Sequence, residues 1–135
     1  MGLANLIGLG GEKRKALINI KACLKTGEVF PHLLLEGLGG TGKTSFAHAI
    51  AEELNYQFVA TEAAALKSRQ DIVECLTLAQ SRAKDSRQTL LFFVDEVHRL
   101  SLKQQEVFYY PMDRKSPRIT TRDGDLYFDS FTMVA

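Results

Sequence analysis

The sequence is poor in cysteine and has no long hydrophobic run. Its two cysteines, Cys23 and Cys75, lie far apart and neither belongs to a CxxC pair. This excludes a disulfide framework and gives no sign of a zinc site or a redox pair, so we expect a reducing, cytoplasmic environment. The longest apolar run, Leu90–Val94, has five residues, whereas a membrane-spanning helix needs about 20. We therefore expect no membrane segment.

The sequence also lacks an excess of charge of either sign. Lysine and arginine number 17 and aspartate and glutamate number 16, which gives a net charge of +1. This balance argues against nucleic-acid binding through overall positive charge, although basic groups gathered locally or supplied by several subunits could still bind it. The hydrophobic content of 45% and the length of 135 residues are ordinary for one globular domain and exclude a disordered chain.

Helix-like and strand-like segments alternate along the chain. In the first amphipathic segment, the spacing of Leu17, Ile20 and Leu24 predicts the buried face of a helix. Ser101 is the expected N-cap of the last helix, and Pro111 its limit. We expect helices over residues 12–26, 44–54, 69–84 and 102–109, and strands near 32–36, 57–61, 89–94 and 131–135. This alternation predicts an α/β fold in which crossover helices connect the strands of a parallel sheet.

The last part of the chain has a different character. Two β-rich runs flank Asp123 and Gly124, which predicts a β-hairpin within residues 116–130. The apolar run 131–135 follows and ends the sequence. Because a domain seldom ends on a central strand, we expect the sequence to be incomplete at its C-terminus.

A glycine-rich segment matches the pattern GxxxxGK[ST]. Its glycines allow the backbone N–H groups to point inward around an anion, and the N-terminus of the following helix adds a positive dipole. Lys43 would reach the β- and γ-phosphates of a nucleotide, and the Thr44 hydroxyl would bind Mg²⁺. The segment therefore predicts a phosphate-binding loop made of Gly37, Leu38, Gly39, Gly40, Thr41, Gly42, Lys43 and Thr44.

Two carboxylates follow the most apolar strand. Asp95 and Glu96 come directly after Leu90–Val94, and ligands bind at the carboxyl ends of parallel strands. Asp95 would hold Mg²⁺, mostly through its water, and Glu96 would act as a general base on the attacking water. The second carboxylate favours a hydrolase over a kinase.

Three other groups of residues are ambiguous. His98 and Arg99 could belong to the site, but solvated structural residues are the better interpretation. Tyr109 and Tyr110 could form an exposed interaction site, but we expect packing in the core or an interface. A set of basic residues could face DNA, but nearby acidic residues favour an ordinary solvated face; the set is Lys67, Arg69, Arg82, Lys84 and Arg87.

These motifs, in this order, resemble those of the AAA+ ATPases, and further phrases resemble the RuvB-type Holliday-junction branch-migration motors. The segments 93–101 and 107–113 are similar to that family's Walker B block and following helix. Ile7 and Gly8 resemble its adenine-side box. The resemblance covers nearly the whole chain. It implies a P-loop three-layer sandwich with strand order 1-4-3-2, lacking the fifth strand.

The resemblance also implies a function. A member of this family is an ATP- and Mg²⁺-dependent DNA helicase that drives branch migration in recombination and repair. It would form a homo-oligomeric ring, a hexamer, and act on four-way junction DNA with a junction-binding partner protein. The sequence ends before any sensor 1 residue, arginine finger or lid. A clamp loader or another AAA+ remodelling ATPase, and a non-catalytic nucleotide-binding module, remain as alternatives.

Overall fold

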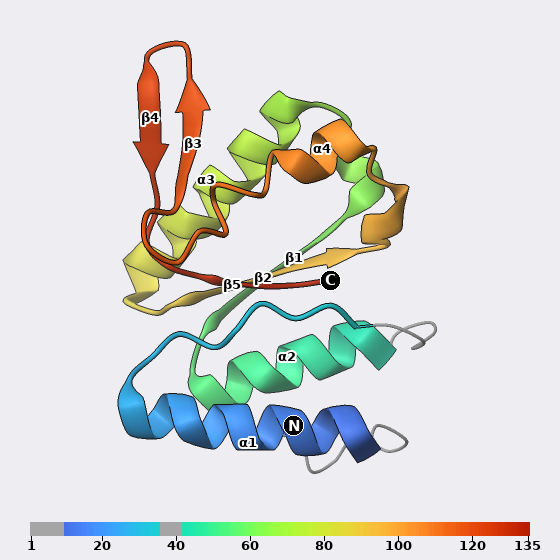
Figure 1. Cartoon of the computed structure of the whole chain (residues 1–135), viewed down its shortest axis with the longest axis vertical. Helices are drawn as coiled ribbons and strands as arrows, with labels where there is room; N and C mark the ends of the chain where they lie inside the picture. Colours follow the sequence, from blue (N-terminus) through green and yellow to red (C-terminus); the bar gives the residue numbers. More distant parts are fainter. Residues whose placement is uncertain (1–9, 36–41) are drawn as a thin grey trace.

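The computed structural model describes residues 10–35 and 42–135, which form a small α/β sandwich (Figure 1). Two 3₁₀ turns, η2 (Ala63–Ala65) and η3 (Val97–Arg99), follow the first two strands. The other elements are α1 (Gly10–Thr26), α2 (Gly42–Leu54), β1 (Gln57–Glu62), α3 (Arg69–Ser86), β2 (Leu90–Asp95), α4 (Leu102–Glu106), β3 (Arg118–Thr121), β4 (Gly124–Tyr127) and β5 (Thr132–Val134).

A parallel sheet with the order β1-β2-β5 forms the middle layer. Helices α1 and α2 cover one face of this sheet, and α3 and α4 lie over the other (Figure 1). The hairpin of β3 and β4 projects from the side that carries α3. The α/β class and the parallel sheet expected from the sequence are thus confirmed.

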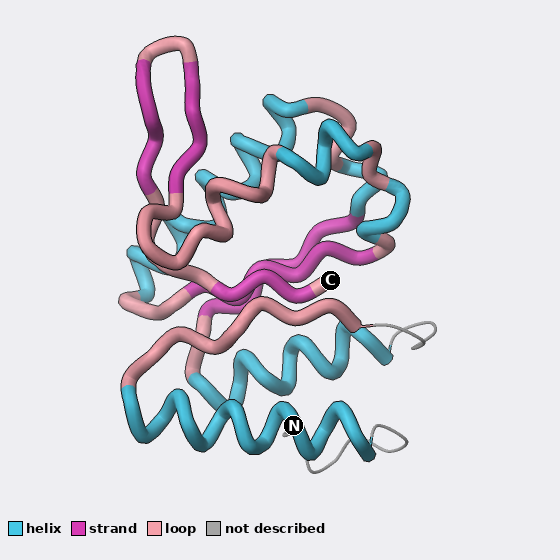
Figure 2. The backbone as a smooth tube through the Cα atoms, in the orientation of Figure 1, coloured by secondary structure: helices cyan, strands magenta, loops and turns pink. Residues whose placement is uncertain are grey.

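Within residues 27–35, the described part of the segment expected to form the first strand, the chain makes a β-bridge and no strand. Residues 27–35 run as a loop beside β5 (Figure 2) and pair with it through a single parallel bridge between Leu33 and Val134. The Leu33 N–H donates to the Met133 carbonyl at 2.9 Å, and the Ala135 N–H donates to the Leu33 carbonyl at 3.0 Å. The described part of this segment ends at Leu35, so the structure describes one bridge where the sequence predicts a strand over 32–36.

Strand β2 is buried on both faces, as its apolar sequence predicts. Leu91 and Phe93 pack among the residues of α1 and α2. Leu90, Phe92 and Val94 pack on the opposite face among residues of α3 and of the chain near α4. Because alternate residues of a strand face opposite sides, one continuous apolar run provides the centre of both halves of the core.

Helix α1 buries a face that is shifted from the one expected: Ile20 is buried as predicted and Leu17 packs partly buried against the core, but Leu24 does not. Its buried residues are Ala16, Ile20 and Cys23, while the Leu24 side chain is 65% exposed. Leu24 lies about 80° around the helix from Ala16, beyond the stripe that faces α2. Small side chains at positions 16 and 23 allow the two helices to approach closely. The prediction that Leu24 is buried is therefore wrong.

Helix α4 is shorter than expected. Ser101 caps it as predicted, because its hydroxyl accepts from the Gln104 N–H at 3.2 Å. After Glu106 the backbone bonds change to the i→i+3 type, which tightens the last turn and ends the helix. Tyr109 and Tyr110 are 63% and 56% exposed, so neither packs in the core of this chain, and of the two expected environments only an interface stays a prediction.

The hairpin turn is displaced by one residue from the expected position. Thr121 pairs with Gly124, so Arg122 and Asp123 form the two-residue loop. The Thr121 hydroxyl donates to the Gly124 carbonyl at 2.6 Å, and Gly124 has a φ of +116° that glycine adopts without strain.

Among the described residues, no helix is both long enough and apolar enough to span a bilayer.

Truncation of a core side chain on β2 tests the two-sided packing. Phe92→Ala removes a fully buried ring and should lower the free energy of unfolding by about 3–5 kcal/mol. Urea unfolding followed by circular dichroism measures this loss. Leu102→Ala, at a side chain that is 75% exposed, is the control and should change the value by about 0.5 kcal/mol or less. Equal effects of the two substitutions would contradict the described core.

His32 connects three segments that are distant in sequence. The Met133 N–H donates to its Nδ1 at 3.0 Å, which leaves the proton on Nε2 for the Met112 carbonyl at 2.9 Å. Burial lowers the pKa of His32, and the nearby Arg114 cation lowers it further, against the opposing effect of the Met112 carbonyl bond. The neutral imidazole is therefore the form that the fold holds.

Acid should weaken the fold through His32. Its folded-state pKa lies below the value of about 6.5 in the unfolded chain, so the unfolded chain takes up the proton first. The contribution of His32 to stability is then complete above pH 6.5 and declines as the pH falls below it. Urea unfolding at pH 7.5 and 5.5 measures the decline. His32→Gln keeps one donor and one acceptor but does not titrate. An equal loss of stability between pH 7.5 and 5.5 in that variant would contradict the role of His32.

Candidate functional site

The N-terminus of α2 presents the positive end of the helix dipole. Gly42, Lys43 and Thr44 form its first turn, which contains no acidic residue. The free N–H groups of this turn, the helix dipole and the Lys43 ammonium group all favour an anion. The rest of the predicted loop, Gly37 to Thr41, and the adenine-side pair Ile7 and Gly8 lie outside the described residues.

The carboxyl ends of β1 and β2 meet beside this turn. Asp95, at the end of β2, is half-buried and pairs in register with Glu62 of β1. Thr44, Glu62 and Asp95 line one small cavity of about 230 Å³, together with Ala60, Thr61 and Phe93. The structure therefore brings Thr44 and Asp95 together, two residues that are 51 positions apart in the sequence.

Glu96 lies on a sharp turn directly after β2. Its φ of +59° and ψ of +40° place it in the left-handed region, which is unfavourable for a residue with a Cβ. Its Oε2 atom lies 3.4 Å from His98 Nε2 and 3.3 Å from Arg99 Nε. All three side chains are largely exposed. His98 and Arg99 are solvated as expected, but they also contact the candidate base.

The donors at this edge suit a magnesium ion. Thr44 offers a hydroxyl and Asp95 a carboxylate, and Mg²⁺ prefers oxygen ligands. The described residues contain no cluster of three or more His, Cys, Asp or Glu side chains that could hold a metal ion by themselves. A bound Mg²⁺ would therefore take its remaining ligands from phosphate oxygens and water, as Mg²⁺ commonly does.

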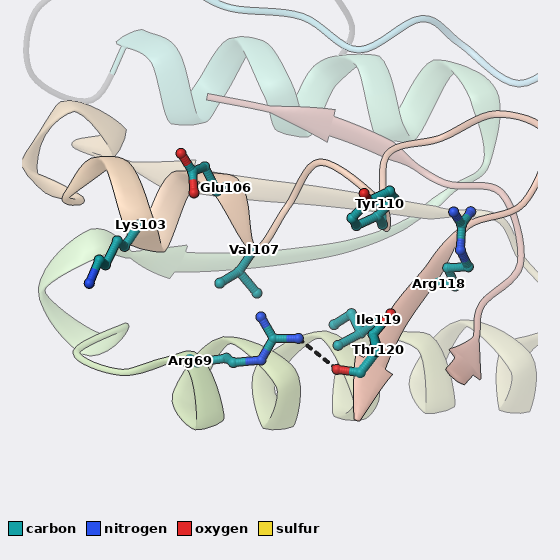
Figure 3. A pocket seen from close by; sticks show the side chains of 8 residues that line it. All are labelled: Arg69, Lys103, Glu106, Val107, Tyr110, Arg118, Ile119 and Thr120. Carbon is teal, nitrogen blue, oxygen red and sulfur yellow. Dashed lines mark hydrogen bonds between the residues drawn. The ribbon is translucent and has the colours of Figure 1, made fainter. Parts of the chain in front are cut away.

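A larger cavity lies away from this edge, between α4, β3 and the start of α3 (Figure 3). Its volume is about 590 Å³. Arg69 crosses its floor and donates to the Thr120 carbonyl at 2.6 Å, while Arg118 lies 4.7 Å from the centre of the Tyr110 ring. Lys103 adds a third cation. The residues that line this cavity include no glycine and no aspartate, so its chemistry does not match a nucleotide site.

Comparison with known sequences decides the family. The sequence model of the Holliday junction DNA helicase RuvB P-loop domain matches residues 2–134. The chain belongs to this RuvB family. The RuvB subunit of the Holliday junction branch migration complex from Prochlorococcus marinus strain NATL2A is 39% identical over 120 residues. That alignment covers 89% of this chain and 32% of the relative. The corresponding subunit from Nostoc punctiforme is 36% identical, with 97% and 36% covered.

Solved RuvB structures have the same fold. The Thermotoga maritima RuvB Holliday junction branch migration motor matches with a TM-score of 0.75 and 30% identity, covering 98% of this chain and 39% of that chain. An A156S mutant of the same protein gives a TM-score of 0.78 at 31% identity. This chain spans about a third of the length of the curated RuvB relatives. The P-loop fold expected from the sequence is confirmed.

Sequence reasoning missed two residues of the site. Thr61 and Glu62 line the same cavity as Thr44 and Asp95. No motif in the sequence marks them, because they are the last two residues of a short and only partly buried strand. The signal that could have found them is positional: the end of any strand that pairs in parallel with β2 reaches the same edge.

Inorganic polyphosphate should stabilise the chain through Lys43. At a hundredfold excess over its dissociation constant, a ligand adds about 2.7 kcal/mol of stability, which corresponds to a rise in Tm of roughly 5–10 °C for a domain of this size. A thermal shift with tripolyphosphate measures this rise, and Lys43→Ala should abolish it. Lys84→Ala removes an exposed lysine from α3 and should retain the full shift. A shift that survives Lys43→Ala would place the anion elsewhere.

Proposed function

We propose that this chain is the ATP-binding and ATP-hydrolysing domain of a RuvB-like motor that moves Holliday junctions in recombination and repair. The observation that carries the proposal is the cavity that joins Thr44, at the start of α2, to Asp95, at the end of β2. The GxxxxGK[ST] pattern leads into that helix, and Glu96 follows that strand. The RuvB relatives, which are named for branch migration, support the biological role.

Each residue at this edge has a defined chemical role in the proposal. The loop from Gly37 to Gly42 would surround the phosphates with backbone N–H groups. Lys43 would neutralise charge that develops on the β- and γ-phosphates. Thr44 would hold Mg²⁺ directly and Asp95 through a water. Mg²⁺, when bound, supplies electrostatic stabilisation of the phosphates.

Glu96 would orient the attacking water and accept its proton. Among the described residues, the ion pairs of this side chain with His98 and Arg99 both involve Oε2, so Oε1 is the oxygen that would receive the hydrogen. Arg99 and His98 would hold the carboxylate in one orientation while it does so. On the adenine side, Ile7 and Gly8 would contact the base, as in the family that the sequence resembles.

We further propose that the protein works as a homo-oligomeric ring, a hexamer, on four-way junction DNA. In such a ring a neighbouring subunit would supply the arginine finger, which accelerates hydrolysis by about 10³–10⁵ in comparable systems. The junction-binding partner protein would contact the hairpin of β3 and β4, next to the basic cavity in Figure 3. This work on DNA implies a cytoplasmic location.

Paired substitutions separate nucleotide binding from hydrolysis. Calorimetric titration with Mg-ATP should detect binding to the chain and to Glu96→Gln, but not to Lys43→Ala. Single-turnover hydrolysis, with the chain in excess over ATP, should be slow because a neighbouring subunit's arginine is missing. Glu96→Gln should slow it at least tenfold further, since general base catalysis contributes about 10²–10⁴.

Two outcomes would contradict this assignment. Undiminished ATP binding by Lys43→Ala would remove the proposed phosphate site. Tight ATP binding together with a hydrolysis rate that Glu96→Gln leaves unchanged would instead identify a non-catalytic nucleotide-binding module.

A further inference from the structure

The alternation of β1 fixes the direction of its last side chain. Phe58 packs with the part of the core that contains α1 and α2, and Val59 packs with the opposite part. Because side chains two residues apart share a face, Ala60 and Glu62 lie on the same face as Phe58. The Glu62 carboxylate therefore lies on the side of the sheet that carries α2.

The register with β2 places a second carboxylate beside it. Glu62 pairs with Asp95, as Ala60 pairs with Phe93, and Phe93 packs among the residues of α1 and α2. Asp95 is two residues further along and shares that face. Neighbouring parallel strands are about 4.8 Å apart, so the two carboxylates flank one another and line the cavity that also contains Thr44.

The Glu62 carboxylate has no other structural role among the described residues. Glu62 is the N-cap of η2, but its side chain makes no capping hydrogen bond. The described part of the chain contains no ion pair to it, and its side chain is exposed. Two adjacent carboxylates repel each other unless a cation lies near both. Their placement is thus unfavourable alone and favourable beside a divalent cation.

We propose that Glu62 is a positioning residue for magnesium: it accepts a hydrogen bond from one water of the Mg²⁺ hydration shell, while Asp95 holds a neighbouring water. This inference rests on the proposed nucleotide site. Mg²⁺ usually retains several of its waters when it binds beside phosphates, and residues that orient those waters tune metal affinity. Glu62 lies at the cavity's exposed margin, which suits contact through water.

Magnesium titration of nucleotide binding tests the proposal without measuring catalysis. The chain is mixed with a fluorescent ADP analogue, first in EDTA and then with increasing Mg²⁺. Glu62→Gln should raise the Mg²⁺ concentration needed for half-maximal enhancement of binding by about tenfold or more. Its affinity in EDTA should equal that of the unmodified chain. Asp95→Asn should shift the same midpoint by at least as much.

Glu53→Gln is the matched control, because it makes the same change of charge at an exposed residue near the far end of α2, and it should leave the midpoint unchanged. An unchanged midpoint in Glu62→Gln, with a shifted one in Asp95→Asn, overturns the role of Glu62 and leaves the nucleotide site intact. Equal weakening in EDTA and in Mg²⁺ also overturns it, because a structural role would have that effect. No nucleotide binding by the unmodified chain overturns the nucleotide site itself.

Discussion

The parallel pairing of β1 with β2 determines where the functional side chains lie. Six consecutive residue pairs hold the two strands in register, and the last pair, Glu62 with Asp95, lies at the carboxyl edge. If β2 slipped by one residue along β1, the Asp95 side chain would lie on the opposite face of the sheet from the Glu62 side chain. Because β2 is buried on both faces, such a slip would also move its phenylalanines out of both halves of the core. The same packing that stabilises the fold therefore fixes the geometry of the site.

A second set of contacts holds the segment that leads to the phosphate loop. The Phe30 carbonyl accepts from the Arg114 guanidinium at 2.6 Å and from the Thr132 hydroxyl at 2.6 Å. Arg114 also donates to the Phe131 carbonyl at 2.8 Å, and His32 adds its two bonds to Met112 and Met133. These polar contacts supplement the single β-bridge of this segment, so they position a loop that the sheet alone would hold only weakly.

Most of the fold could be predicted from the sequence because its signals are local. The run Leu90–Val94 predicts a buried strand, and Ser101 predicts a helix start, since each depends on a few adjacent residues. The errors arise where distant partners decide. Leu24 is exposed because the face of α1 that packs toward α2 contains the small residues Ala16 and Cys23. Glu62 lies in the site only because its strand pairs in register with Asp95. The roles of Lys43 and Glu96 were expected from motifs, and they stand as proposals tested by the substitutions above.

The left-handed backbone at Glu96 has a consequence for how this position can vary. Glycine adopts a φ of +59° without cost, whereas a residue with a Cβ is disfavoured there by roughly 1–2 kcal/mol. A glycine at position 96 would thus make the isolated domain harder to unfold and at the same time remove the carboxylate. The carboxylate at position 96 is therefore held on this turn at a cost in folding stability.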